Sequence, residues 1–472
     1  MTGKTADDAA AVGWADLLRP EWIPSLVVLL GGVLLYSMNV MLLATVLPSI
    51  VGDVGGAALM SWPTTAYLAS SIIAATCTGL LTGWIGPGRT FLAGALIFCA
   101  GSLMCAVAPS MGVVIGGRFV QGLGGGLLSA MSYVLVRQVF PQAVWPRAFA
   151  ALAGIWGVSV LVGPLVGGSF AQYGDWRDAF YAVAALAAAL GVVGLRALPG
   201  GRRPEAVQTT TVPVLRVGLI CLAIAAMSLA AVTTQTAGKA GLIVLTLAAL
   251  ILMLLLDRRS PSPLLPSDAF SLTTVTGVAL WVALLLSFSF NPLSIFGPLF
   301  LQLLHGFEPL AAGYAIAGAS MAWTVAAMAV AGLTDAWPDR MIVFGSAAMA
   351  VGLLGFAVLM PAGPVLPLLI AIVLVGAGIG SAWAFTAQSV MGAARSGEED
   401  IAASSVATVQ QAGLAIGAAL SGLIANAVGF SARVEPAGVA LAAFWVPVFF
   451  VASAGLAVAM AIHLALLKRR TG

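Results

Sequence analysis

The stretch MGVVIGGRFVQGLGGGLLSAMSYVLVRQ, residues 111–138, decides the fold of this chain. A helix needs about 20 predominantly apolar residues to cross the hydrocarbon core of a bilayer, and this stretch supplies them with one charged interruption, Arg118. Its abundant glycines would let neighbouring helix backbones approach closely. The stretch therefore predicts a tightly packed membrane helix that carries a charge roughly 10 Å from one end.

The composition of the whole chain agrees with a membrane environment. Of its 472 residues, 61% are hydrophobic and 8% are charged, whereas a soluble globular protein carries about 25% charged residues. A surface that faces water cannot be built from this composition, so the bilayer must be the solvent for most of it. The net charge of +3 is too small to indicate a nucleic-acid partner.

Fourteen segments are long and apolar enough to span a membrane. They fall into groups of six, two and six, with a polar stretch at 200–211 and a Pro-rich linker at 258–268 around the central pair. The expected spans are 23–48, 62–85, 90–108, 111–138, 146–172, 178–197, 213–233, 239–256, 272–300, 309–334, 340–360, 364–391, 403–428 and 438–467. The corresponding domains are a cytoplasmic N-terminal segment (1–22), an N-terminal six-helix bundle (23–197), a loop with two extra helices and a linker (198–271), a C-terminal six-helix bundle (272–467) and a cytoplasmic tail (468–472).

The basic residues predict the orientation of these spans. An even number of spans places both termini on one side, and 16 of the 20 basic residues then lie on that side. Arg177, Lys239 and Arg433 lie on the other side, and Arg118 lies within a span. Because short cytoplasmic loops are rich in Lys and Arg, we expect both termini to be cytoplasmic. Residues 1–21 are polar and mixed in charge, unlike a signal peptide.

Nothing in the sequence indicates a metal, a cofactor or an enzyme. The four cysteines (Cys77, Cys99, Cys105 and Cys221) sit in apolar runs without a CxxC spacing, and His305 and His463 are far apart. There is no nucleotide-binding GxxxxGK[ST] run, which argues against ATP-driven transport within this chain. A membrane enzyme would need a cluster of His, Asp or Glu, and the spans hold none.

Several motifs occur in an order that resembles a known family. They are Arg118-Phe-Val-Gln-Gly-Leu-Gly-Gly-Gly126, Gly157-Val-Ser-Val-Leu-Val-Gly-Pro-Leu-Val-Gly-Gly168, Leu47-Pro-Ser-Ile50 at the expected end of the first span, Trp176-Arg177, Pro263-Leu-Leu-Pro266 and Leu301-Gln-Leu-Leu-His-Gly306. Over nearly the whole chain they resemble the major facilitator superfamily, and within it the fourteen-helix drug:proton antiporter branch. The first two are similar to the motifs called B and C, the latter associated with antiporters.

This resemblance implies an all-α polytopic membrane protein with two six-helix bundles and two additional central helices. It also implies a secondary transporter of the bacterial inner membrane that exports drug-like or amphipathic molecules by alternating access, coupled to protons. Its partners would be a small-molecule substrate, the lipid bilayer and protons. Two alternatives stay open, a dedicated exporter of an anionic metabolite such as a siderophore or organic acid, and a lipid transporter.

Two departures from the family pattern bear on mechanism. In the loop at 79–89 the family usually has an aspartate where this chain has Gly83, while the matching loop of the second half has Asp335, which also points to an internal repeat. The branch commonly has a carboxylate in the first span where this chain has Asn39. All 17 acids lie in loops, termini or helix ends. A neutral or anionic solute therefore suits the site better than a cation, and any coupling proton would fall to Asp53, Glu308 or Asp335.

The candidate site residues are the polar and aromatic side chains within spans. Arg118 either senses substrate or proton movement or is satisfied structurally by backbone carbonyls. Gly163 and Pro164 either form a kinked contact that gates the cavity or serve ordinary helix packing. Buried amides need partners inside the protein, and these are either the substrate or another helix. The candidates for substrate binding are Tyr36, Asn39, Arg118, Gln121, Tyr133, Trp156, Asn291, Trp323, Gln388 and Gln411.

Overall fold

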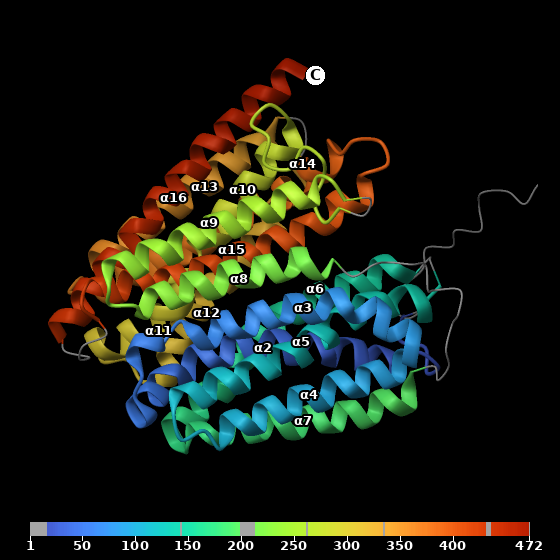
Figure 1. The fold of residues 1–472 in the computed structure, drawn as a ribbon, viewed down its shortest axis with the longest axis horizontal. Coiled ribbons are helices and arrows are strands. Elements are labelled where there is room, and N and C mark those ends of the chain that lie inside the picture. The colour runs from blue at the N-terminus through green and yellow to red at the C-terminus, as the bar shows by residue number, and fades with distance from the viewer. Residues whose placement is uncertain are drawn as a thin grey trace, which may run out of the picture.

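The computed structural model describes residues 17–141, 144–198, 213–260, 263–333, 336–430 and 436–471. These residues form helices joined by short turns, without a strand among them. Among the described residues, fourteen candidate spans are long and apolar enough to cross a membrane, which confirms the number expected from the sequence. Figure 1 shows them as two bundles with a helical pair beside them.

The first bundle follows the expected boundaries closely. It contains α2 (Ile23–Val54), the short η2 (Ala57–Leu59), α3 (Trp62–Ile85), α4 (Pro87–Ala106), α5 (Met111–Val139), α6 (Trp145–Tyr173) and α7 (Trp176–Ala197). The expectation that Leu47-Pro48 ends the first span was wrong, because α2 runs through Pro48 to Val54. Proline removes one hydrogen bond, but in an apolar environment the other backbone groups still need helical partners.

The second bundle has one broken helix. Its members are α10 (Val275–Ser289), α11 (Asn291–His305), α12 (Pro309–Val330), α13 (Trp337–Leu359), α14 (Val365–Gly392), α15 (Glu399–Ala427) and α16 (Pro436–Thr471). The break falls next to Pro292, since α10 ends at Ser289 and α11 carries Pro292 in its first turn. Lys468, Arg469 and Arg470, which belong to the expected tail, lie in the last turn of α16.

The two bundles repeat one packing scheme. In the first, α5 packs on α3 and α4, α4 packs on α7, and α2 packs on α6. In the second, α14 packs on α12 and α13, α13 packs on α16, and α10 packs on α15. Each pair in the first bundle therefore has its counterpart in the second, as expected of an internal repeat.

Glycines make the closest crossings. A Cβ on Gly122 or Gly126 of α5 would lie 2.3 Å from a backbone oxygen of α3, that of Tyr67 or Ser71 respectively. A Cβ on Gly376 or Gly380 of α14 would meet the backbone of α12 as closely. The glycine-rich run of residues 122–126 is thus the surface on which α3 and α4 pack, and helix association without a water-driven hydrophobic effect depends on such close contact.

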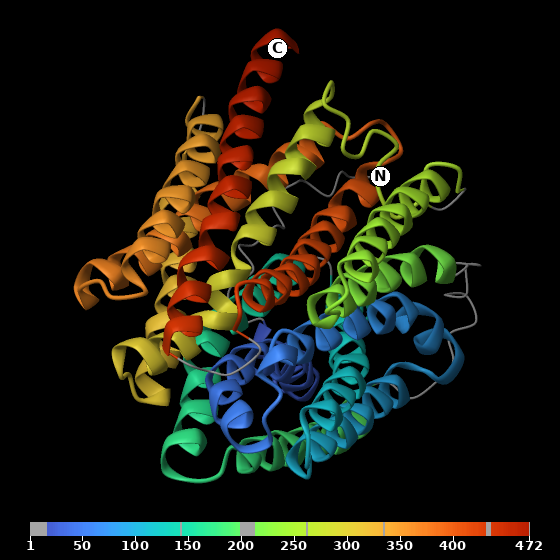
Figure 2. The same cartoon turned by 60° about the vertical axis from the view of Figure 1, so that its left-hand side comes forward.

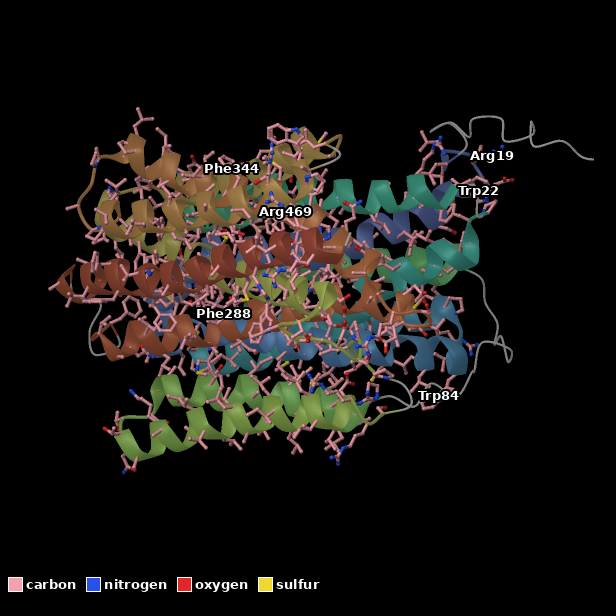
Figure 3. The ribbon with its side chains drawn as sticks, turned by 90° about the horizontal axis from the view of Figure 1, so that it is seen from above. Arg19, Trp22, Trp84, Phe288, Phe344 and Arg469 are labelled. Carbon is pink, nitrogen blue, oxygen red and sulfur yellow. The ribbon has the colours of Figure 1, made fainter. Side chains whose placement is uncertain are left out.

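The two bundles approach one another unequally along their length. We call the side holding the start of α2 and the end of α16 the terminal side, and the opposite side, where α2 ends, the η2 side. In Figure 1 the bundles converge on the η2 side, at the left, and spread apart toward the C-terminus. Trp22 and Trp84 mark the terminal side in Figure 3.

The hairpin of α8 (Val214–Val232) and α9 (Thr236–Asp257) packs through α8 on α15 and α3. Figure 2 shows the pair alongside α15 at the edge of the molecule. Asp257 ties it to the linker, because its carboxylate lies 2.5 Å from Arg216 and accepts hydrogen bonds from the backbone N–H groups of Leu264 and Leu265. The Pro-Leu-Leu-Pro segment is therefore held by a buried ion pair.

We expect Gly126→Ala to destabilise the fold, since the added Cβ would strike the backbone of Ser71 at 2.3 Å. Overpacking of this kind costs about 1–3 kcal/mol. Thermal unfolding of the detergent-purified protein measures the effect. Gly154→Ala is the matched control in α6, where a Cβ meets nothing within 4 Å, and it should raise stability or leave it unchanged. Equal behaviour of the two variants would contradict this account of the α3–α5 contact.

Candidate functional site

Arg118 lies in the interior of the first bundle, with 1% of its surface exposed. Its guanidinium stacks over the ring of Tyr67 at 4.1 Å from the centroid. Nη1 donates to the side-chain oxygen of Asn39 and, at 2.5 Å, to that of Gln121, and Nε donates to the carbonyl of Pro63 at 3.4 Å. Arg118 therefore joins α2, α3 and α5, and it faces protein and not lipid.

A polar chain continues from Arg118 in two directions. Gln121 donates through Nε2 to Ser102 Oγ of α4 at 2.7 Å, and it therefore links Arg118 to α4. Asn39 is fully buried, and its Nδ2 has no hydrogen-bond partner among the described residues. The Asn39 oxygen must face the guanidinium, so rotating the amide would not satisfy the nitrogen. One buried donor thus stays unused beside a buried cation.

Tyr36 forms an aromatic layer next to this pair. Its ring stacks on Tyr67 at 5.5 Å and meets Trp156 edge-on at 6.1 Å. Trp156 is 39% exposed and lies next to Tyr133, which is 43% exposed. The six expected site residues of the first bundle are therefore linked through contacts. Arg118 bonds to Asn39 and Gln121, and Tyr67 joins it to the layer of Tyr36, Trp156 and Tyr133.

Gln411 connects this layer to the second bundle. Its Nε2 lies 2.9 Å from the hydroxyl of Tyr36, while its Oε1 is buried without a described partner. Tyr36 is near the middle of α2 and Gln411 is near the middle of α15. This hydrogen bond is therefore a contact between the halves at mid-membrane depth.

The other described polar and glycine contacts between the halves lie on the η2 side of that bond. Asn426 Nδ2 donates to the carbonyls of Ala58 in η2 and Ala231 in α8, at 2.8 and 2.9 Å. A Cβ on Gly422 would lie 2.1 Å from Ser61 Oγ. Sequence reasoning missed Asn426, although an amide in an apolar span was the signal that identified Asn39 and Gln411.

The glycine-proline run of α6 has two packing roles. Gly163 packs against Met38 and Met41 of α2. Gly168 packs against Leu310, and Pro164 against Gly313, so that α6 also contacts α12 of the other half. Gly157 meets nothing within 4 Å. The run therefore places its tight contacts on the η2 side, where it closes α6 against α12.

Three of the four residues expected from the second bundle lie apart from the Arg118 cluster, and Gln411 is the exception. Asn291 is buried, contacts the carbonyls of Ser287 and Phe288 in its own chain segment, and packs against Gly417. Trp323 packs its ring between Phe290 and Trp383. Gln388 is exposed near the terminal-side end of α14. The described contacts bring none of the three to Arg118.

The repeat identifies the position in the second half that corresponds to Arg118. Gly122 and Gly126 meet α3 as Gly376 and Gly380 meet α12. The position four residues before Gly122 is Arg118, and the corresponding position before Gly376 is Ile372, which is fully buried. The same crossing therefore holds a guanidinium in one half and an alkyl chain in the other.

The acids named as possible proton carriers have different surroundings. Asp53 forms an ion pair with Arg177 at 2.5 Å and accepts a hydrogen bond from Trp176. Glu308 is exposed at the start of α12, without a side-chain cap on that helix. Asp335 lies outside the described residues. Asp257 is buried at a helix end but is already bound by Arg216. Within the described part of the chain, no group of three or more His, Cys, Asp or Glu could hold a metal.

Comparison with known proteins agrees with this architecture. The sequence profile described as Major Facilitator Superfamily matches residues 29–418. The chain is 34% identical to the "Probable multidrug-efflux transporter Rv1634" of Mycobacterium tuberculosis, over 88% of this chain and 89% of that one. It is 26% identical to the "Multidrug transporter protein MdtP" of Bacillus subtilis, over 55% of this chain and 49% of that one. A crystal structure of a peptide transporter in complex with sulfate superposes with a TM-score of 0.66 at 15% identity, over 97% of both chains, and so shares the fold.

We expect Arg118→Met to lower the thermal stability of the protein, since the oxygens of Asn39 and Gln121 would lose their donor. A buried polar group left unsatisfied costs about 1–3 kcal/mol. Adding Asn39→Leu should recover part of the loss, because removing both partners is less costly than removing one. A double-mutant cycle on unfolding in detergent measures this coupling. Strict additivity would contradict the Arg118–Asn39 interaction.

Proposed function

The chain belongs to the major facilitator superfamily, and from that premise we propose that it exports small, drug-like or amphipathic organic molecules by alternating access. It is a multi-pass membrane protein with an apolar exterior suited to a bilayer. The observation that carries the proposal is the uneven contact between its halves, which runs from Tyr36–Gln411 to the η2 side. Two rigid bundles that meet on one side of a central site have the geometry needed to rock around it.

The orientation we propose places the terminal side in the cytoplasm. The excess of basic residues in the loops of that side supports it. The described conformation is then the one in which the bundles meet on the outer side and part toward the cytoplasm. An exporter in this state would receive its substrate from the cytoplasm or the inner leaflet. A bacterial inner membrane is the location we propose, in keeping with the bacterial relatives.

The substrate site we propose centres on the Tyr36 layer. Trp156 and Tyr133 are aromatic and partly exposed, and Gln411 supplies an unused acceptor from the other half. Aromatic walls with a few polar groups are typical of sites for small organic ligands. The similarity to two proteins named for multidrug transport supports export of drug-like compounds. Asn291, Trp323 and Gln388 have no described contact with this layer.

We propose protons as the coupling ion and Glu308 as their carrier. Asp53 is engaged by Arg177, whereas Glu308 is exposed and stands two residues before Leu310, at the contact of α12 with Gly168. Protonation there would change the charge beside the contact that must open on the outer side. Gly163 and Pro164 would take part in gating through the packing of α6 on α2 and α12.

A disulfide across the outer contact tests alternating access. The ideal Cβ of Gly422 lies 2.9 Å from the Cβ of Ser61, and a slight shift brings the pair into the about 3.5–4.5 Å range of disulfides. With the native cysteines replaced by alanine, oxidised Ser61→Cys/Gly422→Cys protein in liposomes should export a fluorescent drug at less than about a tenth of the reduced rate. The single Ser61→Cys variant should be insensitive to oxidation. Undiminished export by the cross-linked protein would disprove this mechanism.

Glu308→Gln separates coupling from transport. In liposomes we expect the variant to lose drug accumulation driven by a pH gradient, because the amide cannot carry a proton, and to keep exchange of labelled for unlabelled drug. Asp53→Asn is the comparison, since Asp53 already has a basic partner. A Glu308→Gln protein that still accumulates drug in response to the pH gradient would remove Glu308 from the proposal.

A further inference from the structure

The buried guanidinium of Arg118 is not balanced by an acid in the described part of the chain. Its partners are a tyrosine ring, two amide oxygens and one carbonyl, all of them uncharged. Two acids form ion pairs away from Arg118. Asp53 pairs with Arg177 on the η2 side, and Asp257 pairs with Arg216 on the terminal side. An unpaired charge in the membrane interior is costly, and such residues usually serve a pathway or a ligand.

Unused hydrogen-bond donors accompany this charge. No described residue accepts a hydrogen bond from Nη2 of Arg118. Asn39 Nδ2 is buried and equally without a partner. Leaving one buried donor unsatisfied costs about 1–3 kcal/mol. Two nitrogens that can only donate, one of them cationic, call for a ligand that accepts hydrogen bonds and carries negative charge.

Tyr36 lies near this pair and contacts the other half of the protein. It precedes Asn39 by three residues and so lies on the same face of α2, one turn toward the terminal side. Its ring stacks on Tyr67, and its hydroxyl meets Gln411 of the other half at 2.9 Å and Ser71 of its own half at 3.5 Å. Moving α15 away from α2 would break the Gln411 contact and leave Tyr36 packed within its own half. The donors of Arg118 and Asn39 therefore lie next to an aromatic layer that one hydrogen bond ties to the other half.

We propose that Arg118 and Asn39 form a binding site for an acidic group, such as a carboxylate, on the exported molecule. This rests on the proposed export function and narrows its substrate class. The ligand carries one anionic oxygen group, which accepts hydrogen bonds from Nη2 of Arg118 and Nδ2 of Asn39. Its flat apolar part packs on Tyr36 and Trp156, and a donor group on it reaches Oε1 of Gln411. A cation is disfavoured, because it would meet the guanidinium without a carboxylate to offset it.

Three probes of one shape test the charge preference. They are 2-naphthoate, its neutral amide and the 2-naphthylmethylammonium cation, measured by equilibrium dialysis against the protein in nanodiscs with empty nanodiscs as background. The natural sequence should bind naphthoate at least about tenfold tighter than the amide, which corresponds to about 1.4 kcal/mol. Equal binding of the two, or a preference for the cation, would overturn the proposal.

Asn39→Asp gives the sharpest variant, since it is nearly isosteric and supplies the missing acid beside Arg118. It should abolish the preference for naphthoate over the amide. Gln235→Glu introduces the same charge at an exposed position before α9, away from the site, and should leave the preference intact. If Asn39→Asp does not fold, Asn39→Leu removes the donor instead and should weaken naphthoate binding alone. A preference that survives either folded variant would overturn the proposal.

Two further measurements distinguish failure of the acid-binding site from failure of the proposed export function. Binding in chloride and in gluconate buffer distinguishes the substrate's acid from a free halide, and loss of the naphthoate preference in chloride alone would assign the site to the inorganic ion. Export of a neutral fluorescent drug in liposomes reports the function independently. If that export persists while naphthoate shows no preference, the acid-binding site is wrong and the exporter stands. If no drug is exported, the proposed function itself fails.

Discussion

The burial of one guanidinium in an apolar bundle is the constraint on which the first half of this protein depends. Desolvating such a charge is costly unless every nearby group is arranged to accept its hydrogen bonds. Arg118 meets part of that demand through Pro63, Asn39 and Gln121 and through the ring of Tyr67. These partners come from three helices, and they reach Arg118 because the glycines that follow it let α3 and α4 pack against α5 without intervening side chains.

The two halves share this packing but not its chemistry. Gly376 and Gly380 repeat the crossing made by Gly122 and Gly126, yet Ile372 stands where the first half has Arg118. The described polar side chains of the second half that bond to the first half are neutral. They are Gln411 at mid-depth, Tyr314 against Leu161 of α6, and Asn426 on the η2 side. The charge therefore belongs to one bundle, and the other contributes neutral contacts that can be broken when the bundles move.

The sequence predicted the fold well and the site in part. Hydropathy yields the spans, because it depends on local composition, and Pro292 in the first turn of α11 accounts for the break after α10. The pairing of Asn39 with Arg118 depends on how α2 crosses α5, which no single-span pattern contains. The same limit applies to Gln388, an amide in an apolar run that proves to be exposed near a helix end, and to Asn426, which bridges α15, η2 and α8.

The central claim is that Arg118 and Asn39 lack a protein acid and take one from the ligand. The most direct measurement is a crystal structure with 6-bromo-2-naphthoate, in which anomalous scattering locates the bromine and the density orients the carboxylate. We predict the carboxylate within hydrogen-bonding distance of Arg118 Nη2 and Asn39 Nδ2, with the ring on the Tyr36 side. A carboxylate bound elsewhere, or a glutamate or aspartate side chain found against the guanidinium, would contradict the account.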